Sequence, residues 1–174
     1  MPIALIWGAS GGIGSAIVED LKQNGWKVYA AARREDDIPD AADKTYPFDA
    51  CDPFSIQSAA MLIAQEVDGV DLVIYAAGGL TPSPLEKLEP EQWSEIIAAN
   101  LDGAYLTARS SINLLHKGGH MMFIGAYVEK ITLPRMAAHW PTGAEVAGFK
   151  ATMLAFERAN WAVRGIGPPS VPIA

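Results

Sequence analysis

The chain has 174 residues, half of them hydrophobic and 19% charged, with a formal net charge of −7. This composition is typical of one globular domain, 1–174, and the acidic balance argues against nucleic acid as a main partner because phosphate binding needs a basic surface. One cysteine excludes an internal disulfide and favours a reducing, cytoplasmic setting, while no apolar run predicts a membrane span or a signal peptide.

A glycine-rich turn with the spacing G-x-x-x-G-x-G follows the first apolar run, residues 3–7, which predicts a buried strand. The apolar spacing after the turn predicts a helix. Glycines lack a Cβ and let a pyrophosphate approach the backbone, and the free N–H groups of a helix start favour the anion. The predicted nucleotide contacts are Gly8, Ser10, Gly11, Gly12, Ile13 and Gly14. The alternative is a tight strand-to-helix connection that binds no ligand.

The second predicted strand, 26–32, is followed by Arg33. An acidic residue at this strand end would bind the 2′-hydroxyl of an adenosine ribose, whereas a guanidinium suits a 2′-phosphate. Arg33 therefore favours NADP(H) over NAD(H) as the cofactor. The alternative is that Arg33 and Arg34 only form surface ion pairs with the acidic residues 35–37.

Strands and helices then alternate along the chain. Their predicted ranges are a strand at 45–49, a helix from Pro53 to about Val67 capped by Asp52, a strand at 71–75, a long helix from about Glu91 to Leu115 ended by Gly118-Gly119, and a strand at 121–124. Ala76, Ala77 and Gly78 form a second turn at a strand end, where open α/β sheets bind ligands. The order predicts an α/β fold with a doubly wound, Rossmann-like parallel sheet and helices on both faces.

Together these motifs resemble those of the short-chain dehydrogenase/reductase family. The matching features are the glycine turn, Asp49, the turn 76–78 with alanine in place of its usual first Asn, and the Asn-bearing segment 100–104. The resemblance implies an NAD(P) cofactor and hydride transfer to or from a carbonyl or alcohol carbon of a small molecule. It also implies that Asp49 and Ala50 contact the cofactor, Asp49 at the adenine, and that Asn100 belongs to the catalytic set.

The rest of the family's catalytic set is not at its expected positions. Ala126 stands where the family has a Ser, and no register supplies the Tyr and the Lys four residues after it. One register places His139 and Gly143 there, and a second places Val146 and Lys150. His139 could act as general acid/base or be a loop residue, and Lys150 could reach the nicotinamide ribose if its helix shifts. No metal site is expected.

The C-terminal region also departs from the family pattern. Three prolines and two glycines within 164–172 leave little room for the family's sixth strand, and because the chain stops at Ala174 the substrate lid is expected to be absent. The resemblance further implies a homodimer or homotetramer. The apolar stripes expected at its interface are Trp93, Ile97, Leu101, Ala104 and Ala108 on one helix and Met153, Leu154, Phe156 and Trp161 on another.

The function that these features favour is an NADP(H)-binding oxidoreductase with impaired catalysis. The alternatives are a non-catalytic dinucleotide-binding protein and an altered or truncated remnant of such an enzyme.

Overall fold

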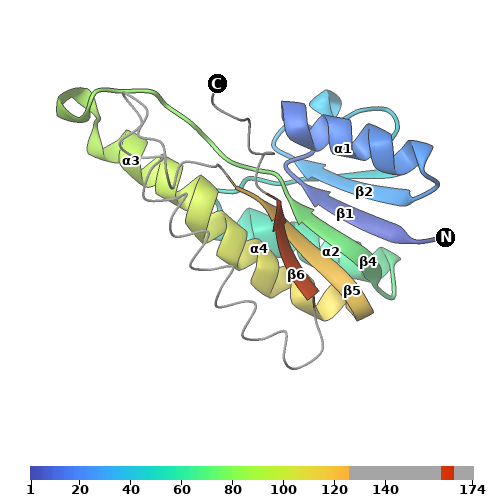
Figure 1. Cartoon of the computed structure of the whole chain (residues 1–174). Coiled ribbons are helices and arrows are strands. Elements are labelled where there is room, and N and C mark those ends of the chain that lie inside the picture. The colour runs from blue at the N-terminus through green and yellow to red at the C-terminus, as the bar shows by residue number, and fades with distance from the viewer. Residues whose placement is uncertain (126–161, 167–174) are drawn as a thin grey trace, which may run out of the picture.

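The computed structural model describes residues 1–125 and 162–166, and within them six parallel strands form one sheet. The strand order is β3-β2-β1-β4-β5-β6. The strands are β1 Ile3–Trp7, β2 Lys27–Ala32, β3 Lys44–Pro47, β4 Val70–Tyr75, β5 Leu115–Ile124 and β6 Ala162–Ile166. Helix α1 (Gly12–Gln23) covers one face, and α2 (Pro53–Glu66) and α4 (Gly103–Ser111) cover the other (Figure 1). The predicted doubly wound, Rossmann-like fold is confirmed.

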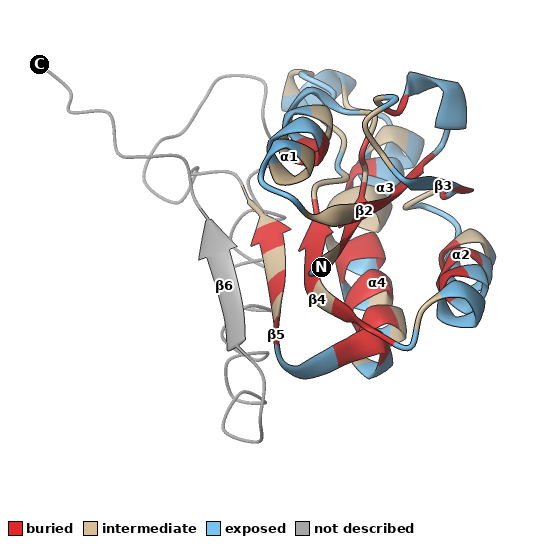
Figure 2. Cartoon of the chain, turned by 90° about the vertical axis from the view of Figure 1, so that its right-hand side faces the viewer, coloured by how far each residue is buried: buried red, intermediate tan, exposed pale blue. Residues whose placement is uncertain are grey.

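Alternation along each strand divides the core into two layers. In β1, Leu5 and Trp7 pack in the layer that holds α2 and α4, whereas Ala4 and Ile6 pack in the layer that holds α1. Figure 2 shows the resulting buried strands between partly exposed helices. A parallel sheet buried on both faces explains why its strands read as continuous apolar runs in the sequence.

Local signals set the start of α2, as predicted, and the end of α1. The Oδ1 of Asp52 accepts the N–H of Phe54 at 2.9 Å, and Pro53 occupies the first position of α2. After α1, Gly25 has a φ of +80°, a left-handed conformation that glycine adopts without strain.

The predicted long helix 91–115 is wrong in its continuity and its end. The structure has α3 (Pro90–Ile97), a π-helical turn (Ala98–Asp102), α4 and a 3-10 turn (Ile112–Leu114), after which β5 begins. Gly118 and Gly119, which were expected to end the helix, lie within β5. Pairing of this segment with β4 overrides its local helical pattern.

The expectation that 164–172 leaves little room for a strand is also wrong. Residues 162–166 form β6, which pairs with β5 from His120 to Ile124. The strand ends at Ile166, so the three prolines of this range, Pro168, Pro169 and Pro172, follow it in the sequence.

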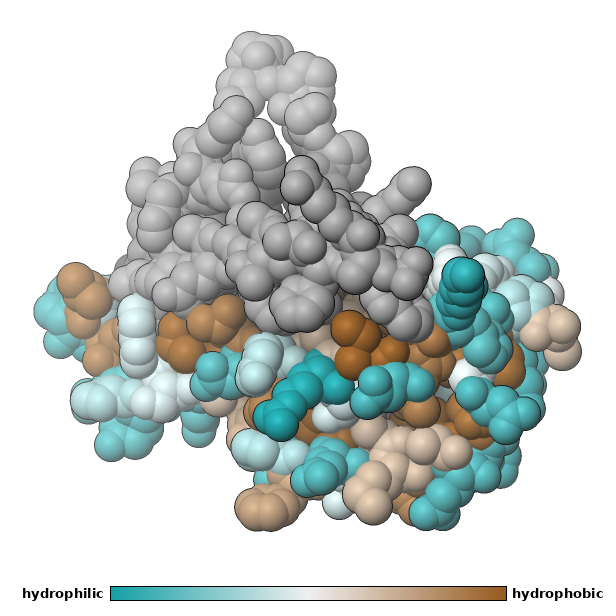
Figure 3. All heavy atoms as spheres, turned by 90° about the horizontal axis from the view of Figure 1, so that it is seen from below, coloured by the Kyte–Doolittle hydropathy of each residue, from teal (hydrophilic) through white to brown (hydrophobic). Residues whose placement is uncertain are grey.

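The surface of the molecule combines hydrophilic residues with hydrophobic patches, as the face in Figure 3 shows. Ala104 and Ala108, which were predicted to lie at a dimer interface, are only 1% and 2% exposed because they face the core beneath α4. The exposed residues on this segment are instead Asp102, Tyr105 and Arg109. The second predicted stripe lies outside the described residues. No helix in the described ranges is long and apolar enough to cross a membrane.

Candidate functional site

A cavity of about 360 Å³ lies at the carboxyl ends of β1, β2, β3 and β4. Segments that follow these strands line it, together with α3 and the π turn. The lining residues are Gly8, Ser10, Gly11, Ala32, Arg33, Phe48, Asp49, Ala50, Cys51, Ala76, Ala77, Gly78, Gly79, Thr81, Glu95, Ile96 and Ala99. The cavity therefore occupies the sheet edge where open α/β folds bind ligands.

Most of the predicted cofactor residues meet in this one cavity. Those that line it are Gly8, Ser10, Gly11, Arg33, Asp49, Ala50, Ala76, Ala77 and Gly78. Gly12, Ile13 and Gly14 are not among the lining residues and form the first turn of α1. Gly11 lines the cavity and directly precedes α1, so the first turn of the helix begins next to the cavity.

Two glycines of this turn are required by close backbone contacts. Gly8 has a φ of +90°, and a Cβ on it would lie 2.4 Å from the backbone nitrogen of Ala77. A Cβ on Gly14 would lie 2.1 Å from the carbonyl oxygen of Gly8. A Cβ on Gly12, in contrast, would have no atom within 4 Å. Backbone packing thus explains why glycine is needed at positions 8 and 14, but it does not explain the glycine at position 12, where there is open space.

The N-terminal end of α1 carries no compensating negative charge. Gly11 offers no side-chain cap, and the first turn of α1 holds no acidic residue. A helix start concentrates partial positive charge on its free N–H groups, and Gly11 places this end at the cavity. The arrangement suits an anion.

Arg33 and Arg34 differ in their partners. Arg34 forms an ion pair with Asp37. Arg33 is exposed, lines the cavity and makes no hydrogen bond or ion pair with any of the residues that the structure describes. Pairing with the acidic run, the alternative considered for both arginines, therefore holds for Arg34 only.

Asp49 is fixed in the loop after β3. Its N–H donates to Ser55 Oγ at 2.9 Å, and its Oδ1 accepts the N–H of Cys51 at 2.9 Å. Its Oδ2 makes no hydrogen bond within the described ranges and remains available to a ligand donor.

The thiol of Cys51 lies 3.8 Å from the carbonyl oxygen of Glu95 in α3. Burial raises the pKa of this thiol, and the negative charge of Asp49 raises it further. The positive charge of Arg33 lowers the pKa but does not cancel these two effects. A protonated thiol is a poor nucleophile, so the cysteine has no evident catalytic use.

Sequence reasoning missed seven further lining residues besides Cys51. They are Ala32, Phe48, Gly79, Thr81, Glu95, Ile96 and Ala99. Several directly adjoin predicted contacts, which is a signal that could have found them. Ile96 and Ala99 precede Asn100 within one turn of helical structure, so their placement depends on how that segment packs.

Asn100 holds the turn after β4 rather than lining the cavity. Its Nδ2 donates to the carbonyl oxygen of Gly79 at 2.9 Å, and its Oδ1 accepts the N–H of Gly79 at 3.1 Å. A Cβ on Gly78 would lie 2.5 Å from Asn100 Oδ1, which explains the glycine there. The other predicted catalytic residues, His139 and Lys150, lie outside the described residues. Among the described residues no group of His, Cys, Asp or Glu could hold a metal ion.

Comparison with known proteins adds a family and a set of relatives. The family model described as short chain dehydrogenase matches residues 2–171. The 3-oxoacyl-[acyl-carrier-protein] reductase FabG of Escherichia coli is 30% identical over 159 residues, which cover 87% of this chain and 65% of that protein. The corresponding reductase of Vibrio cholerae is 29% identical with the same coverage. The chain thus spans slightly less than two thirds of these relatives.

Solved structures share the fold. A metagenomic short-chain oxidoreductase in complex with NADP superposes with a TM-score of 0.88 at 23% identity, covering 98% of this chain and 82% of that one. A short-chain dehydrogenase/reductase from Brucella melitensis gives a TM-score of 0.89 at 18% identity, covering 95% of this chain and 74% of that one.

Proposed function

The chain belongs to the short-chain dehydrogenase family, and from this premise we propose that it binds NADP(H) in the cavity at the sheet edge. The reaction class that we propose is hydride transfer to or from the carbonyl or alcohol carbon of a small molecule. The observation that carries the cofactor proposal is the gathering of nine predicted contact residues around one cavity, including Arg33, which forms no ion pair with any described residue.

The pyrophosphate of the cofactor suits the start of α1. The uncapped N–H groups provide hydrogen-bond donors, and the helix dipole favours negative charge. The open space at Gly12 lets an anion approach without meeting a side chain. No described side chain caps these N–H groups or fills the space at Gly12, which supports a ligand at this position.

The adenosine end suits the other wall of the cavity. Arg33 offers a forked guanidinium to a 2′-phosphate, and this charge-assisted contact is the basis for preferring NADP(H) over NAD(H). Asp49 Oδ2 can accept a hydrogen bond from the exocyclic amine of adenine. The bound cofactor supplies or accepts the hydride; the described residues hold and orient it.

Catalysis is proposed to be slow or absent. Both functional atoms of the Asn100 amide are bound to Gly79, and the sequence supplies no Tyr with a Lys four residues after it. A general acid/base contributes about 10²–10⁴-fold to rate, so its loss would dominate the kinetics. These observations favour, as the second candidate function, a dinucleotide-binding protein without turnover.

The names of the relatives support a carbonyl compound as the substrate class, since the Escherichia coli protein is a 3-oxoacyl-[acyl-carrier-protein] reductase. The single cysteine supports a cytoplasmic location. A homodimer or homotetramer is the expected assembly.

Cofactor binding can be tested by following the alkylation of Cys51. Cys51 is the chain's single cysteine and lines the cavity, so saturating NADPH should slow its alkylation by iodoacetamide at least several-fold, and NADH at equal concentration should protect it less. Fluorescence titration gives the dissociation constants, and a screen of carbonyl substrates then tests turnover. No protection and no binding at millimolar NADPH would refute the proposal.

A further inference from the structure

The last residue of β4, Tyr75, connects the strand to the π turn. Its side chain is only 2% exposed, and its ring packs against Phe123 of β5 at a centroid distance of 6.3 Å. Its hydroxyl donates to the carbonyl oxygen of Ala99. A π turn departs from the regular hydrogen-bond spacing of an α-helix, and here a side chain from the sheet binds a carbonyl within it.

A second contact attaches the same turn to the segment after β4. Asn100, the residue after Ala99, forms two hydrogen bonds with Gly79, whereas Ala99 itself lines the cavity. Adjacent residues of the π turn are therefore held by the end of β4 and by the loop that follows it. Both attachments lie at the cavity wall.

Gly103 makes room for this arrangement. A Cβ on Gly103 would lie 2.6 Å from the Tyr75 hydroxyl and 2.6 Å from the carbonyl oxygen of Ala50, another lining residue. Any side chain here would push the hydroxyl or the loop after β3 out of place. The Tyr75 hydroxyl can therefore occupy its position only because residue 103, at the start of α4, is a glycine.

We propose that Tyr75 is a positioning residue of the cavity: its hydroxyl fixes the π turn and so sets the wall formed by Glu95, Ile96 and Ala99. Burial raises the pKa of Tyr75, so the hydroxyl remains a donor at any physiological pH. The consequence for NADP(H) affinity rests on the proposed function, whereas the effect on the wall does not.

The test compares two tyrosines that lose the same atom. Tyr75→Phe removes the hydroxyl at the π turn, and Tyr46→Phe removes a buried hydroxyl in β3 that does not line the cavity. The local probe is the rate at which iodoacetamide alkylates Cys51 in the cofactor-free protein, because the Cys51 thiol contacts the carbonyl of Glu95 in the same wall. Thermal midpoints and NADPH dissociation constants are measured alongside.

For Tyr75→Phe we expect Cys51 alkylation to accelerate and NADPH to bind about threefold to tenfold more weakly, the range expected for one lost hydrogen bond. Tyr46→Phe should leave the alkylation rate and the NADPH dissociation constant within about twofold of the unmodified protein. This should hold even if Tyr46→Phe lowers the thermal midpoint as much as Tyr75→Phe does. Equal changes in the two variants, or an unchanged alkylation rate in Tyr75→Phe, would overturn the proposal.

Two further measurements keep the outcome decisive. If Tyr75→Phe does not fold, Gly103→Ala approaches the same contact from α4 and should accelerate alkylation in the same way; an unchanged rate would again overturn the proposal. If the unmodified protein binds no NADPH, the proposed cofactor fails, and the alkylation rates still decide whether Tyr75 positions the wall.

Discussion

At the scale of single residues, the glycines of the first turn separate packing from ligand binding. Gly8 and Gly14 lack room for a Cβ, whereas Gly12 does not. A substitution at Gly14 would therefore disturb the fold together with any binding. Gly12 offers the cleaner test, because a side chain there meets solvent or ligand and no described residue.

Gly12→Asp should abolish NADPH binding without loss of stability. An aspartate in the first turn of α1 complements the helix dipole by about 0.3–1 kcal/mol, so the free energy of unfolding should hold or rise. The same carboxylate would repel the pyrophosphate. Isothermal titration and denaturant unfolding measure the two effects, with Gly12→Ala as the uncharged control. Undiminished binding in the aspartate variant would remove the pyrophosphate from this turn.

Arg33→Ala should weaken NADPH more than NADH. A hydrogen bond to a charged group contributes about 1.5–3 kcal/mol, so the preference for NADPH should fall roughly tenfold or more. Arg34→Ala is the matched control, since Arg34 pairs with Asp37 and does not line the cavity. Equal losses for both cofactors in Arg33→Ala would show that this guanidinium does not bind the 2′-phosphate.

At the scale of elements, sequence reasoning succeeded where local signals decide the structure. The apolar runs predicted β1, β2 and β4 to within about one residue, and the Asp52 cap placed the start of α2. The same reasoning extended one helix through 91–115, because its apolar spacing continues across a segment that the structure divides.

The missed break has a tertiary cause. The π turn is held by Tyr75 and by the pairing of Asn100 with Gly79, contacts between residues more than twenty positions apart. No local pattern reveals such contacts. The wall residues Glu95, Ile96 and Ala99 were missed for the same reason, whereas Gly8, Arg33 and Ala76, each of which directly follows a strand, were found.

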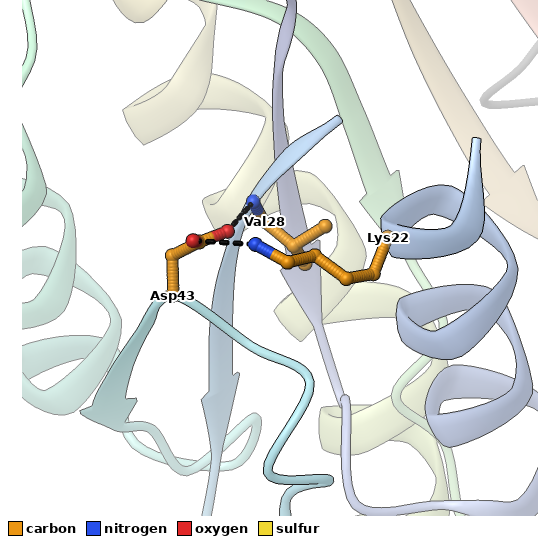
Figure 4. A network of polar contacts seen from close by, with 3 residues as sticks. All are labelled: Lys22, Val28 and Asp43. Carbon is orange, nitrogen blue, oxygen red and sulfur yellow. Dashed lines mark hydrogen bonds and ion pairs between the residues drawn. The ribbon is translucent and has the colours of Figure 1, made fainter. Parts of the chain in front are cut away.

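A polar network ties the loop before β3 to α1 and β2 (Figure 4). Asp43 Oδ1 lies 2.6 Å from Lys22 Nζ, and its Oδ2 accepts the N–H of Val28 at 2.8 Å. Burial alone would raise the pKa of Asp43, but these two hydrogen bonds and the lysine charges together lower it. The folded state therefore gains stability from the ionised carboxylate.

The sign of the pH dependence follows. Because the pKa of Asp43 is lower in the folded state, its contribution is present above about pH 4 and is lost as the pH falls through the folded value. Asp43→Asn should cost about 1 kcal/mol of unfolding free energy at pH 7, and this difference should shrink towards pH 2. Denaturant unfolding across that range measures it. A penalty for Asp43→Asn that stays constant across this range would contradict the assignment.

At the scale of the whole molecule, the exposed side of α4 and the π turn is the surface that we propose for contact with a second copy of the chain. Asp102 and Arg109 carry opposite charges at either end of this surface, with Tyr105 between them. A two-fold axis would set these helices antiparallel and place each Asp102 near the Arg109 of the other copy. We therefore expect a homodimer built on this surface rather than on the buried Ala104 and Ala108.

Arg109→Glu should convert the dimer to a monomer, because it would oppose two pairs of carboxylates across the axis. Light scattering at micromolar concentration measures the mass, and Arg34→Glu controls for the change in net charge at a site away from α4. A monomeric unmodified protein, or a dimer that persists in Arg109→Glu, would exclude this surface.

The strand order has a consequence for synthesis. β1 leaves the ribosome before the other five strands of the described sheet, yet one of its edges pairs with β4, residues 70–75, which emerges only after β2, β3 and α2. Until then, β1 and β2 can pair while an apolar strand edge stays open to other chains. We expect a nascent chain that stops before residue 70 to aggregate or to hold a chaperone, and one that exposes residues 70–75 to release it.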